Sequence, residues 1–290
     1  MRSAKVKKSL KFLGNDGSGW TDDAIAAFDY ATMMRRDYGV NVRVTNNSWG
    51  GGGYSQALHD AIAEVGEAGI LSIAAAGNDS SNNDAVPHYP SNYDVDSIVS
   101  VAATAHNDDL ASFSSYGLTT VDLAAPGVAI TSALPGDDYE AWNGTSMASP
   151  HVSAVAALLW SHFPNASLEE VRDAIFNGVD PLPSLRGRMV TEGRLNAFNA
   201  FKFMGLMIRQ SSPARDSTVA APPTDFVLSF ADPYDPTAVD ATDLEVNGNP
   251  ADSFTITDAV TLTFHFDTSP VCTLHVAPEG LFLHGWCMNP

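Results

Sequence analysis

The chain has 290 residues, of which 44% are hydrophobic and 17% charged, a composition that supports a buried core and differs from that of disordered proteins. Asp and Glu outnumber Lys and Arg by 34 to 15, and the formal net charge of −19 argues against a nucleic-acid or anionic-membrane surface. The sequence contains no run of about 18 apolar residues that could span a membrane. The basic start is followed by FLGNDG at residues 12–17 and not by the apolar stretch of a signal peptide.

The first 205 residues alternate short β-rich runs with helical patterns. Strands are expected at Val40–Val44, Ile70–Ala76 and Ser97–Ala102, and the apolar spacing of Tyr54–Val65 predicts a helix. This order implies parallel strands joined by crossover helices, and continuously apolar strands imply a sheet that is covered on both faces. The sequence therefore predicts an α/β domain built as a three-layer parallel sheet.

Two further helices are expected near the end of this region. Met147–Trp160 is apolar on nearly every side, which indicates a central buried helix, and Pro150 is tolerated in its first turn. Ser167–Ile175 begins with Ser167 as N-cap and has two glutamates in its first turn.

The composition changes after residue 209. Residues 210–223 are rich in Ser, Pro and Ala, which indicates a linker. Beyond it, Phe226–Phe230, Phe254–Thr257 and Val260–Phe266 alternate with period two between turn signals, which predicts antiparallel β structure. The expected divisions are a domain at 1–208, a linker at 209–223 and a small all-β segment at 224–290.

Residues 143–151, NGTSMASPH, place a serine directly after a glycine turn at the start of the expected buried helix. Unpaired backbone N–H groups and the helix dipole favour negative charge there, which suits Ser146 as a nucleophile whose attack on a carbonyl generates an oxyanion. On position alone, an N-cap role for Thr145 or Ser146 is the better explanation, because Ser and Thr are common caps.

Asn78 follows the expected strand at residues 70–76, just past its carboxyl end. Active sites of parallel α/β sheets assemble at that edge. The Asn78 amide is either a turn former or an oxyanion-hole donor, and this residue alone does not decide between the two.

Taken together, five motifs resemble the subtilisin-like serine proteases (subtilases, the peptidase S8 family) and occur in the family's order. The resemblance covers about residues 5–205 and implies the subtilisin-like fold, incomplete at its N-terminus. Its motifs are GTSMASPHV at 144–152 for the nucleophile, AAAGN at 74–78 for the oxyanion hole, two substrate-flanking stretches at 11–19 and 47–51, and a structural turn at 122–128.

By that resemblance, Ser146 forms the acyl-enzyme, while the Asn78 side chain and the Ser146 backbone N–H form the oxyanion hole. The polypeptide substrate binds as an extended strand, a mode that tolerates many side chains. The pocket for the residue before the scissile bond has small walls, which leave room for a large apolar or aromatic side chain. The implied substrate-binding residues are Gly17, Ser18, Gly19, Ser48, Trp49, Gly50, Ala75, Ala76 and Gly77.

The motifs that carry the family's catalytic Asp and His, Asp-Ser/Thr-Gly and His-Gly-Thr-His, do not occur in this sequence. His151 belongs to the buried helix, where the family's motif also has a non-catalytic histidine. We therefore expect the C-terminal portion of a subtilase, inactive or very weak by itself, whose activity needs an N-terminal segment that supplies Asp and His. Four other histidines match no catalytic element and are interpreted as ordinary surface or core residues: His59, His88, His106 and His162.

The absent part has two further consequences. The family's Asp-bearing strand lies in mid-sheet, so its absence would leave two strands with unpaired backbone groups. The family's tightest calcium site also takes ligands from that part. A weaker structural calcium site near Asp122 and the carbonyls of residues 90–93 is compatible with the resemblance, but we expect that it does not form. The chemistry itself requires no cofactor.

Two other classes of protein compete with the endopeptidase. An α/β-hydrolase esterase would use Gly-x-Ser-x-Gly, but Ala148 stands where the final glycine is required. A catalytically dead, protease-like binding module of a secreted protein is favoured by the absent Asp and His, and disfavoured because Ser146 and Asn78 are both retained.

The segment after about Val219 resembles the bacterial immunoglobulin-like modules appended to secreted proteases, which implies a role in spacing or surface attachment. The family resemblance as a whole implies a secreted or cell-surface protein. Two cysteines near the C-terminus, Cys272 and Cys287, are too few to decide whether a disulfide forms.

Overall fold

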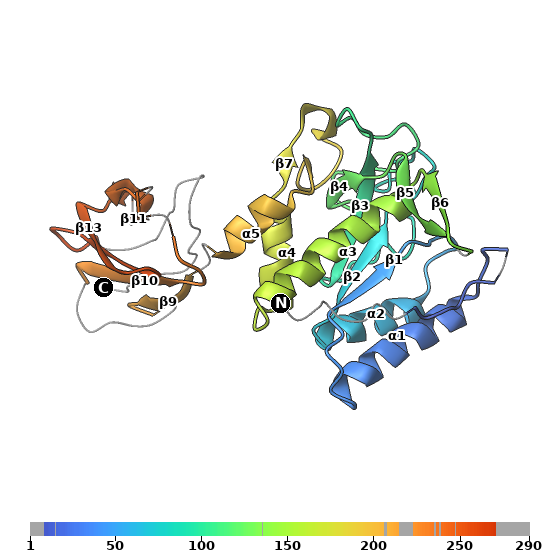
Figure 1. Ribbon diagram of the computed structural model, residues 1–290, viewed down its shortest axis with the longest axis horizontal. Coiled ribbons are helices and arrows are strands. Elements are labelled where there is room, and N and C mark those ends of the chain that lie inside the picture. The colour runs from blue at the N-terminus through green and yellow to red at the C-terminus, as the bar shows by residue number, and fades with distance from the viewer. Residues whose placement is uncertain are drawn as a thin grey trace. The chain divides into compact units, whose positions relative to one another are not determined.

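The protein is described from a computed structural model (Figure 1), in which the described residues are 9–14, 16–134, 136–205, 208–214, 223–234, 236–237, 239–246 and 248–270. The chain divides into two compact units, Met1–Phe201 and Lys202–Pro290. Cys272 and Cys287 lie outside the described residues.

The first unit contains a six-stranded sheet with the order β1-β2-β3-β4-β8-β7. Neighbours among β1, β2, β3, β4 and β8 pair in parallel, and β7 is antiparallel to β8. The strands are β1 (Val44–Asn47), β2 (Leu71–Ala75), β3 (Ile98–Thr104), β4 (Leu123–Pro126), β7 (Asp180–Pro181) and β8 (Gly193–Arg194).

Helices cover this sheet. Figure 1 shows α1 and α2 on one side of it, and α3, on the other side, packs against β1 to β4. The chain also forms a hairpin of β5 (Ile130–Leu134) and β6 (Asp138–Trp142), which leads into α3, and a short 3-10 helix at Pro183–Leu185. The helices are α1 (Thr21–Arg36), α2 (Gln56–Glu67), α3 (Thr145–His162), α4 (Leu168–Asn177) and α5 (Ala197–Gly205), the last of which crosses from the first unit into the second.

The predicted α/β organisation is confirmed. Every residue of β2 and β3 is buried, as expected for strands covered on both faces. The three expected helices form as α2, α3 and α4, and Ser167 caps α4 in a capping box with Glu170.

Two elements differ from the prediction. The strand expected at Val40–Val44 begins only at Val44 and continues through two asparagines, because pairing with β2 fixes its register. Their polar side chains are bonded locally, since Asn46 donates to Ser48 and Asn47 donates to Thr45. Helix α1 was not predicted, although acidic residues in its first turn and arginines in its last complement the helix dipole.

The second unit contains an antiparallel sheet with the order β13-β14-β10-β9 and a small β11–β12 pair. The antiparallel pairing predicted here is confirmed, but β9 occupies the start of the expected linker, which is therefore shorter at its N-terminal end. The elements are β9 (Ile208–Ser212), β10 (Asp225–Phe230), β11 (Glu245–Val246), β12 (Asn249–Pro250), β13 (Ser253–Asp258), β14 (Thr261–His265) and a 3-10 turn at Ala241–Asp243.

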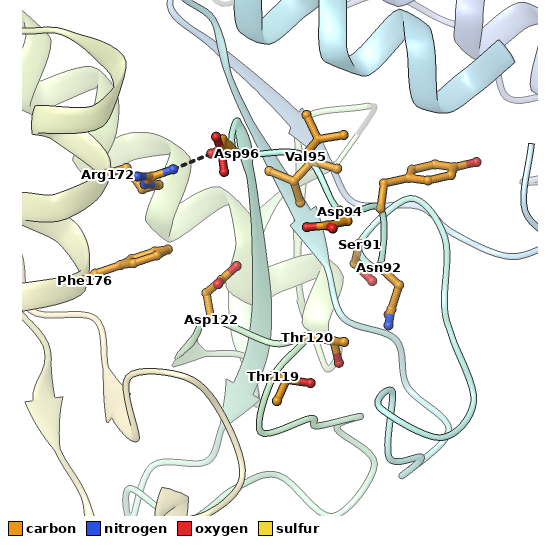
Figure 2. A pocket seen from close by; sticks show the side chains of 12 residues that line it. Ser91, Asn92, Asp94, Val95, Asp96, Thr119, Thr120, Asp122, Arg172 and Phe176 are labelled. Atoms are coloured by element: carbon orange, nitrogen blue, oxygen red, sulfur yellow. Dashed lines mark hydrogen bonds between the residues drawn. The ribbon is translucent and has the colours of Figure 1, made fainter. Parts of the chain in front are cut away.

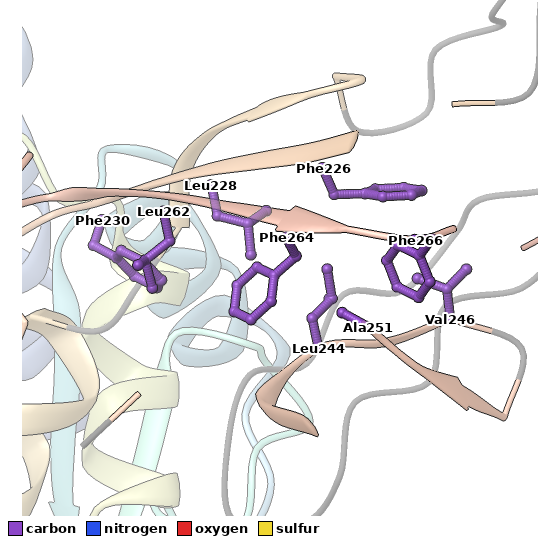
Figure 3. Close-up of a cluster of buried hydrophobic side chains, with 9 residues drawn as sticks. All are labelled: Phe226, Leu228, Phe230, Leu244, Val246, Ala251, Leu262, Phe264 and Phe266. Carbon is purple, nitrogen blue, oxygen red and sulfur yellow. The ribbon is translucent and has the colours of Figure 1, made fainter. Parts of the chain in front are cut away.

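Alternating residues of β10 and β14 give this sheet one apolar face, as Figure 3 shows for Phe226, Leu228 and Phe264. Leu244 and Val246 belong to the same buried cluster and come from the segment around β11. The immunoglobulin-like architecture expected for this region stays a prediction.

We expect Ser167→Ala to lower the free energy of unfolding by about 1 kcal/mol, because the N-cap hydroxyl that accepts the Glu170 N–H at 3.0 Å is lost. Urea denaturation measures the change. Ser161→Ala, at an exposed site in α3, is the control and should be close to neutral. Equal destabilisation by the two variants would contradict the role of the cap.

Candidate active site

Helix α3 begins directly after Gly144, whose φ of 155° strongly favours glycine over side-chain-bearing residues. The turn before it is fixed by two hydrogen bonds. The Gly144 N–H donates to the Gly127 carbonyl at 2.9 Å, and the Asn143 side chain accepts the Ala129 N–H at 2.6 Å. The sequence therefore places the first residues of a buried helix at a defined point beside the sheet.

Asn78 is joined to this helix start through Thr145. Its Oδ1 accepts the Thr145 N–H at 2.8 Å and the Thr145 hydroxyl at 3.1 Å. The Thr145 hydroxyl in turn accepts the Gly77 N–H at 3.2 Å. Because both donors hold Oδ1, the amide orientation is fixed, and within the described chain no group accepts a hydrogen bond from Nδ2. The Asn78 amide is thus held at the start of α3 in a fixed orientation.

Ser146 and Ser48 are linked reciprocally. The Ser146 hydroxyl donates to the Ser48 carbonyl at 3.2 Å, and the Ser48 hydroxyl donates to the Ser146 carbonyl at 2.8 Å. The Ser48 hydroxyl also lies 2.9 Å from that of Ser149. The segment expected to bind substrate is therefore attached to the helix that carries the expected nucleophile.

None of the described histidines is bonded to Ser146, whose hydroxyl donates to a main-chain carbonyl, a group that cannot serve as a general base. His151 lies in α3, and its Nδ1 is hydrogen-bonded to the Met147 carbonyl at 2.8 Å. That His151 is not the base stays a prediction.

The other expected substrate residues fall into three groups. Ala75, Ala76 and Gly77 are buried at the end of β2, whereas Trp49 and Gly50 follow β1 and are partly or fully exposed. Gly17, Ser18 and Gly19 lie in an exposed turn, where the described hydrogen bonds of the first two stay within residues 14–18. The segment at residues 11–19 contacts the segment at residues 47–51 through Phe12, whose ring centroid lies 5.1 Å from that of Trp49.

His88 lies against two of the expected substrate glycines. A side chain at Gly50 would collide with its Cε1 atom, and one at Gly77 would lie 3.1 Å from its Cδ2 atom. The sequence interpretation treated His88 as an ordinary histidine. No local pattern signals this position, because the contacts arise between three separate segments.

Asp122 lines a separate pocket of about 410 Å³. Figure 2 shows Asp122 on the same pocket as Arg172, whose guanidinium donates to the Asp96 carbonyl at 2.8 Å. Asp122 accepts the Ser100 N–H at 2.7 Å, and its burial raises its pKa from 3.8 to about 6.

These residues do not fit a calcium site well. Ca²⁺ takes about six to eight oxygen ligands with several carboxylates, and in the described part of the chain no three Asp, Glu, His or Cys side chains gather around one point. Arg172, the cation beside Asp122, lowers the pKa of that carboxyl by its charge and would repel a metal ion.

We expect ionisation of Asp122 to contribute a fall of about 3 kcal/mol in the free energy of unfolding as the pH rises from about 4 to above 6, because folded Asp122 binds its proton more tightly than the unfolded chain does. Asp122→Asn should remove this fall and leave the protein more stable at pH 8. Urea denaturation across this pH range measures it, with the exposed Asp29→Asn as control. A pH dependence that is unchanged in Asp122→Asn would refute the assignment.

Ser146 thus stands at the start of a buried helix, is bonded to the loop after β1, and lies near the Asn78 amide at the carboxyl edge of a parallel sheet. The sequence pattern of Peptidase_S8, described as the subtilase family, matches residues 2–200. The chain belongs to the subtilase family.

Individual relatives agree with this assignment. Subtilisin DY of Bacillus licheniformis is 39% identical over 168 residues, 58% of each chain. Subtilisin-like protease 7 of Arthroderma gypseum is 44% identical over 150 residues, which cover 52% of this chain and 36% of that protein. Subtilisin-like protease 4 of Trichophyton tonsurans is 40% identical over 151 residues, 52% of this chain and 37% of that protein. The chain thus matches between about a third and three fifths of the length of these relatives. None of the helices in the described ranges is long and apolar enough to cross a membrane.

Proposed function

We propose that this chain is the serine-bearing part of a subtilisin-type endopeptidase, in which Ser146 is the nucleophile and Asn78 the oxyanion-hole donor. The Ser146 Oγ attacks the carbonyl carbon of the scissile peptide bond, and its proton passes to a base. The tetrahedral intermediate then breaks its C–N bond, the amine leaves with that proton, and water hydrolyses the resulting ester.

The observation that carries the proposal is the pair of hydrogen bonds from Thr145 to Asn78 Oδ1. They orient the amide in advance, so that Nδ2 and the Ser146 N–H at the start of α3 are available to the developing oxyanion. Donors that are already oriented stabilise this charge without a reorganisation cost during the reaction.

The base is proposed to come from a segment that carries the family's Asp and His. The position of β1 supports this, because among the described strands β1 pairs only with β2 and forms one edge of the six-stranded sheet. An additional parallel strand can hydrogen-bond to that edge, just before Ser48 and the nucleophile. The added strand would thus bring the base close to Ser146.

The proposed substrates are extended polypeptides, and the proposed setting is outside the cell. The loop that follows β1 is attached to Ser146 through Ser48, which supports a strand-like substrate beside it. For the second unit we propose a role in spacing or attachment. The proposed chemistry uses no cofactor, and no calcium ion enters it.

The second candidate is a protease-like binding module without catalysis. It is favoured by the contact between the Ser146 hydroxyl and the Ser48 carbonyl, which leaves the serine held but not activated. The two candidates predict different outcomes once a base is supplied.

The test is hydrolysis of a peptide ester after the chain is mixed with an N-terminal segment of a relative such as subtilisin DY that carries Asp and His. We expect hydrolysis by the mixture, none with Ser146→Ala, and a loss of about 10²–10³-fold in kcat with Asn78→Ala, the size of effect found for this donor in subtilisin itself. The exposed Asn107→Ala should leave the rate unchanged.

Complex formation is followed separately by gel filtration. A stable complex without hydrolysis would favour the binding module and contradict the endopeptidase. Hydrolysis that survives Ser146→Ala would contradict both proposed roles at the site.

A further inference from the structure

His88 fills the space between the two backbone segments that border the expected pocket. Side chains on Gly50, in the loop after β1, and on Gly77, at the end of β2, would both point at its imidazole ring. Since the two directions converge on one ring, the ring lies between the two segments. The Gly51 N–H also donates to the carbonyl of Tyr89, the residue after His88, at 2.9 Å. This bond holds the loop after β1 against the segment that carries His88.

The ring orientation is set by Ser91. The Ser91 hydroxyl donates its single proton to the His88 carbonyl at 2.7 Å, so its oxygen can only accept from the ring. Nδ1 lies 3.3 Å from that oxygen and is therefore the protonated nitrogen. Nε2 then carries a lone pair, and no described group donates a hydrogen bond to it.

The environment favours the neutral ring. Burial lowers the pKa of His88 below 6.5, and the negative charge of Asp79 opposes this shift without reversing it. At neutral pH the ring therefore presents an acceptor at Nε2, on the edge that lies against Gly50.

We propose that His88 determines which side chain the site accepts at the residue before the scissile bond, selecting short side chains that donate a hydrogen bond to Nε2, with serine the simplest. This inference rests on the proposed function. The ring takes up the space that small walls at Ala75, Ala76 and Gly77 would leave to a large apolar side chain. The preference for large apolar or aromatic residues expected from those walls alone is therefore replaced by one for short polar residues.

The test measures binding, so that it needs no base. Calorimetry follows acetyl-Ala-Ala-Ala-X peptides with a free carboxylate, where X is Ala, Ser or Phe, added to the 290-residue chain. Their carboxylate mimics the product at Asn78 and Ser146. We expect the Ser peptide to bind more tightly than the Ala peptide, and the Phe peptide to bind at least about tenfold more weakly than the Ala peptide, the scale on which a pocket discriminates side chains by size.

Two variants separate bulk from hydrogen bonding. His88→Ala should bind the Phe peptide at least about tenfold more tightly than the wild type and lose the preference for Ser. His88→Phe keeps the bulk, so it should still exclude the Phe peptide and also lose the preference for Ser. His106→Ala, at an exposed histidine, should behave as the wild type, and circular dichroism checks that each variant is folded.

The outcomes test the role of His88 and the proposed function separately. Binding of all three peptides with equal affinity by the wild type and His88→Ala would overturn the role of His88 and leave the proposed cleft intact. Tightest binding of the Phe peptide by the wild type would do the same. Absence of binding by every peptide to folded protein would overturn the proposed function and, with it, this inference.

Discussion

The site depends on a single junction, where Thr145 joins the start of a buried helix to the end of a buried strand. Its N–H and hydroxyl both donate to Asn78, and its hydroxyl accepts from Gly77. Thr145 is completely buried, so these bonds form away from competing water and unpaired groups there would be costly. The same junction sets the position of Ser146 and the orientation of the Asn78 amide.

The two sides of this junction differ in how completely the described residues build them. The side at Asn78 is closely packed, because every residue of β2 and β3 is buried and both strands contact α3. The side that would activate the serine is different. There β1 ends the sheet and the Ser146 hydroxyl contacts only a main-chain carbonyl in the described chain. Ser146 is thus held at a fixed point, and we propose that its reactivity depends on a segment that pairs with β1.

Sequence patterns predicted the parts of the fold that depend on local or periodic signals. Buried strands such as β2 are continuous apolar runs in the sequence, and Ser167 and Glu170 form a recognisable capping box at the start of α4. The start of β1 was predicted too early, because partner strands and not propensity fix where a short strand begins. Helix α1 was missed despite its charged ends, because its apolar face is narrow.

The candidate site was predictable where it coincides with linear motifs and unpredictable where it arises from distant contacts. Ser146 and Asn78 stand in recognisable segments, and the structure brings these segments together through Thr145. His88 stands in no motif, and only folding brings it to Gly50 and Gly77. The poor fit of calcium at Asp122 likewise depends on Arg172, which lies far away in the sequence.

We propose that Ser146 is held in place yet not activated by the residues of this chain. A fluorophosphonate probe, which reacts with activated serines, tests it most directly when its incorporation at residue 146 is quantified by mass spectrometry. We expect only trace labelling of the folded chain alone and near-stoichiometric labelling after a segment with Asp and His is added. Stoichiometric labelling of Ser146 in the chain alone would contradict it.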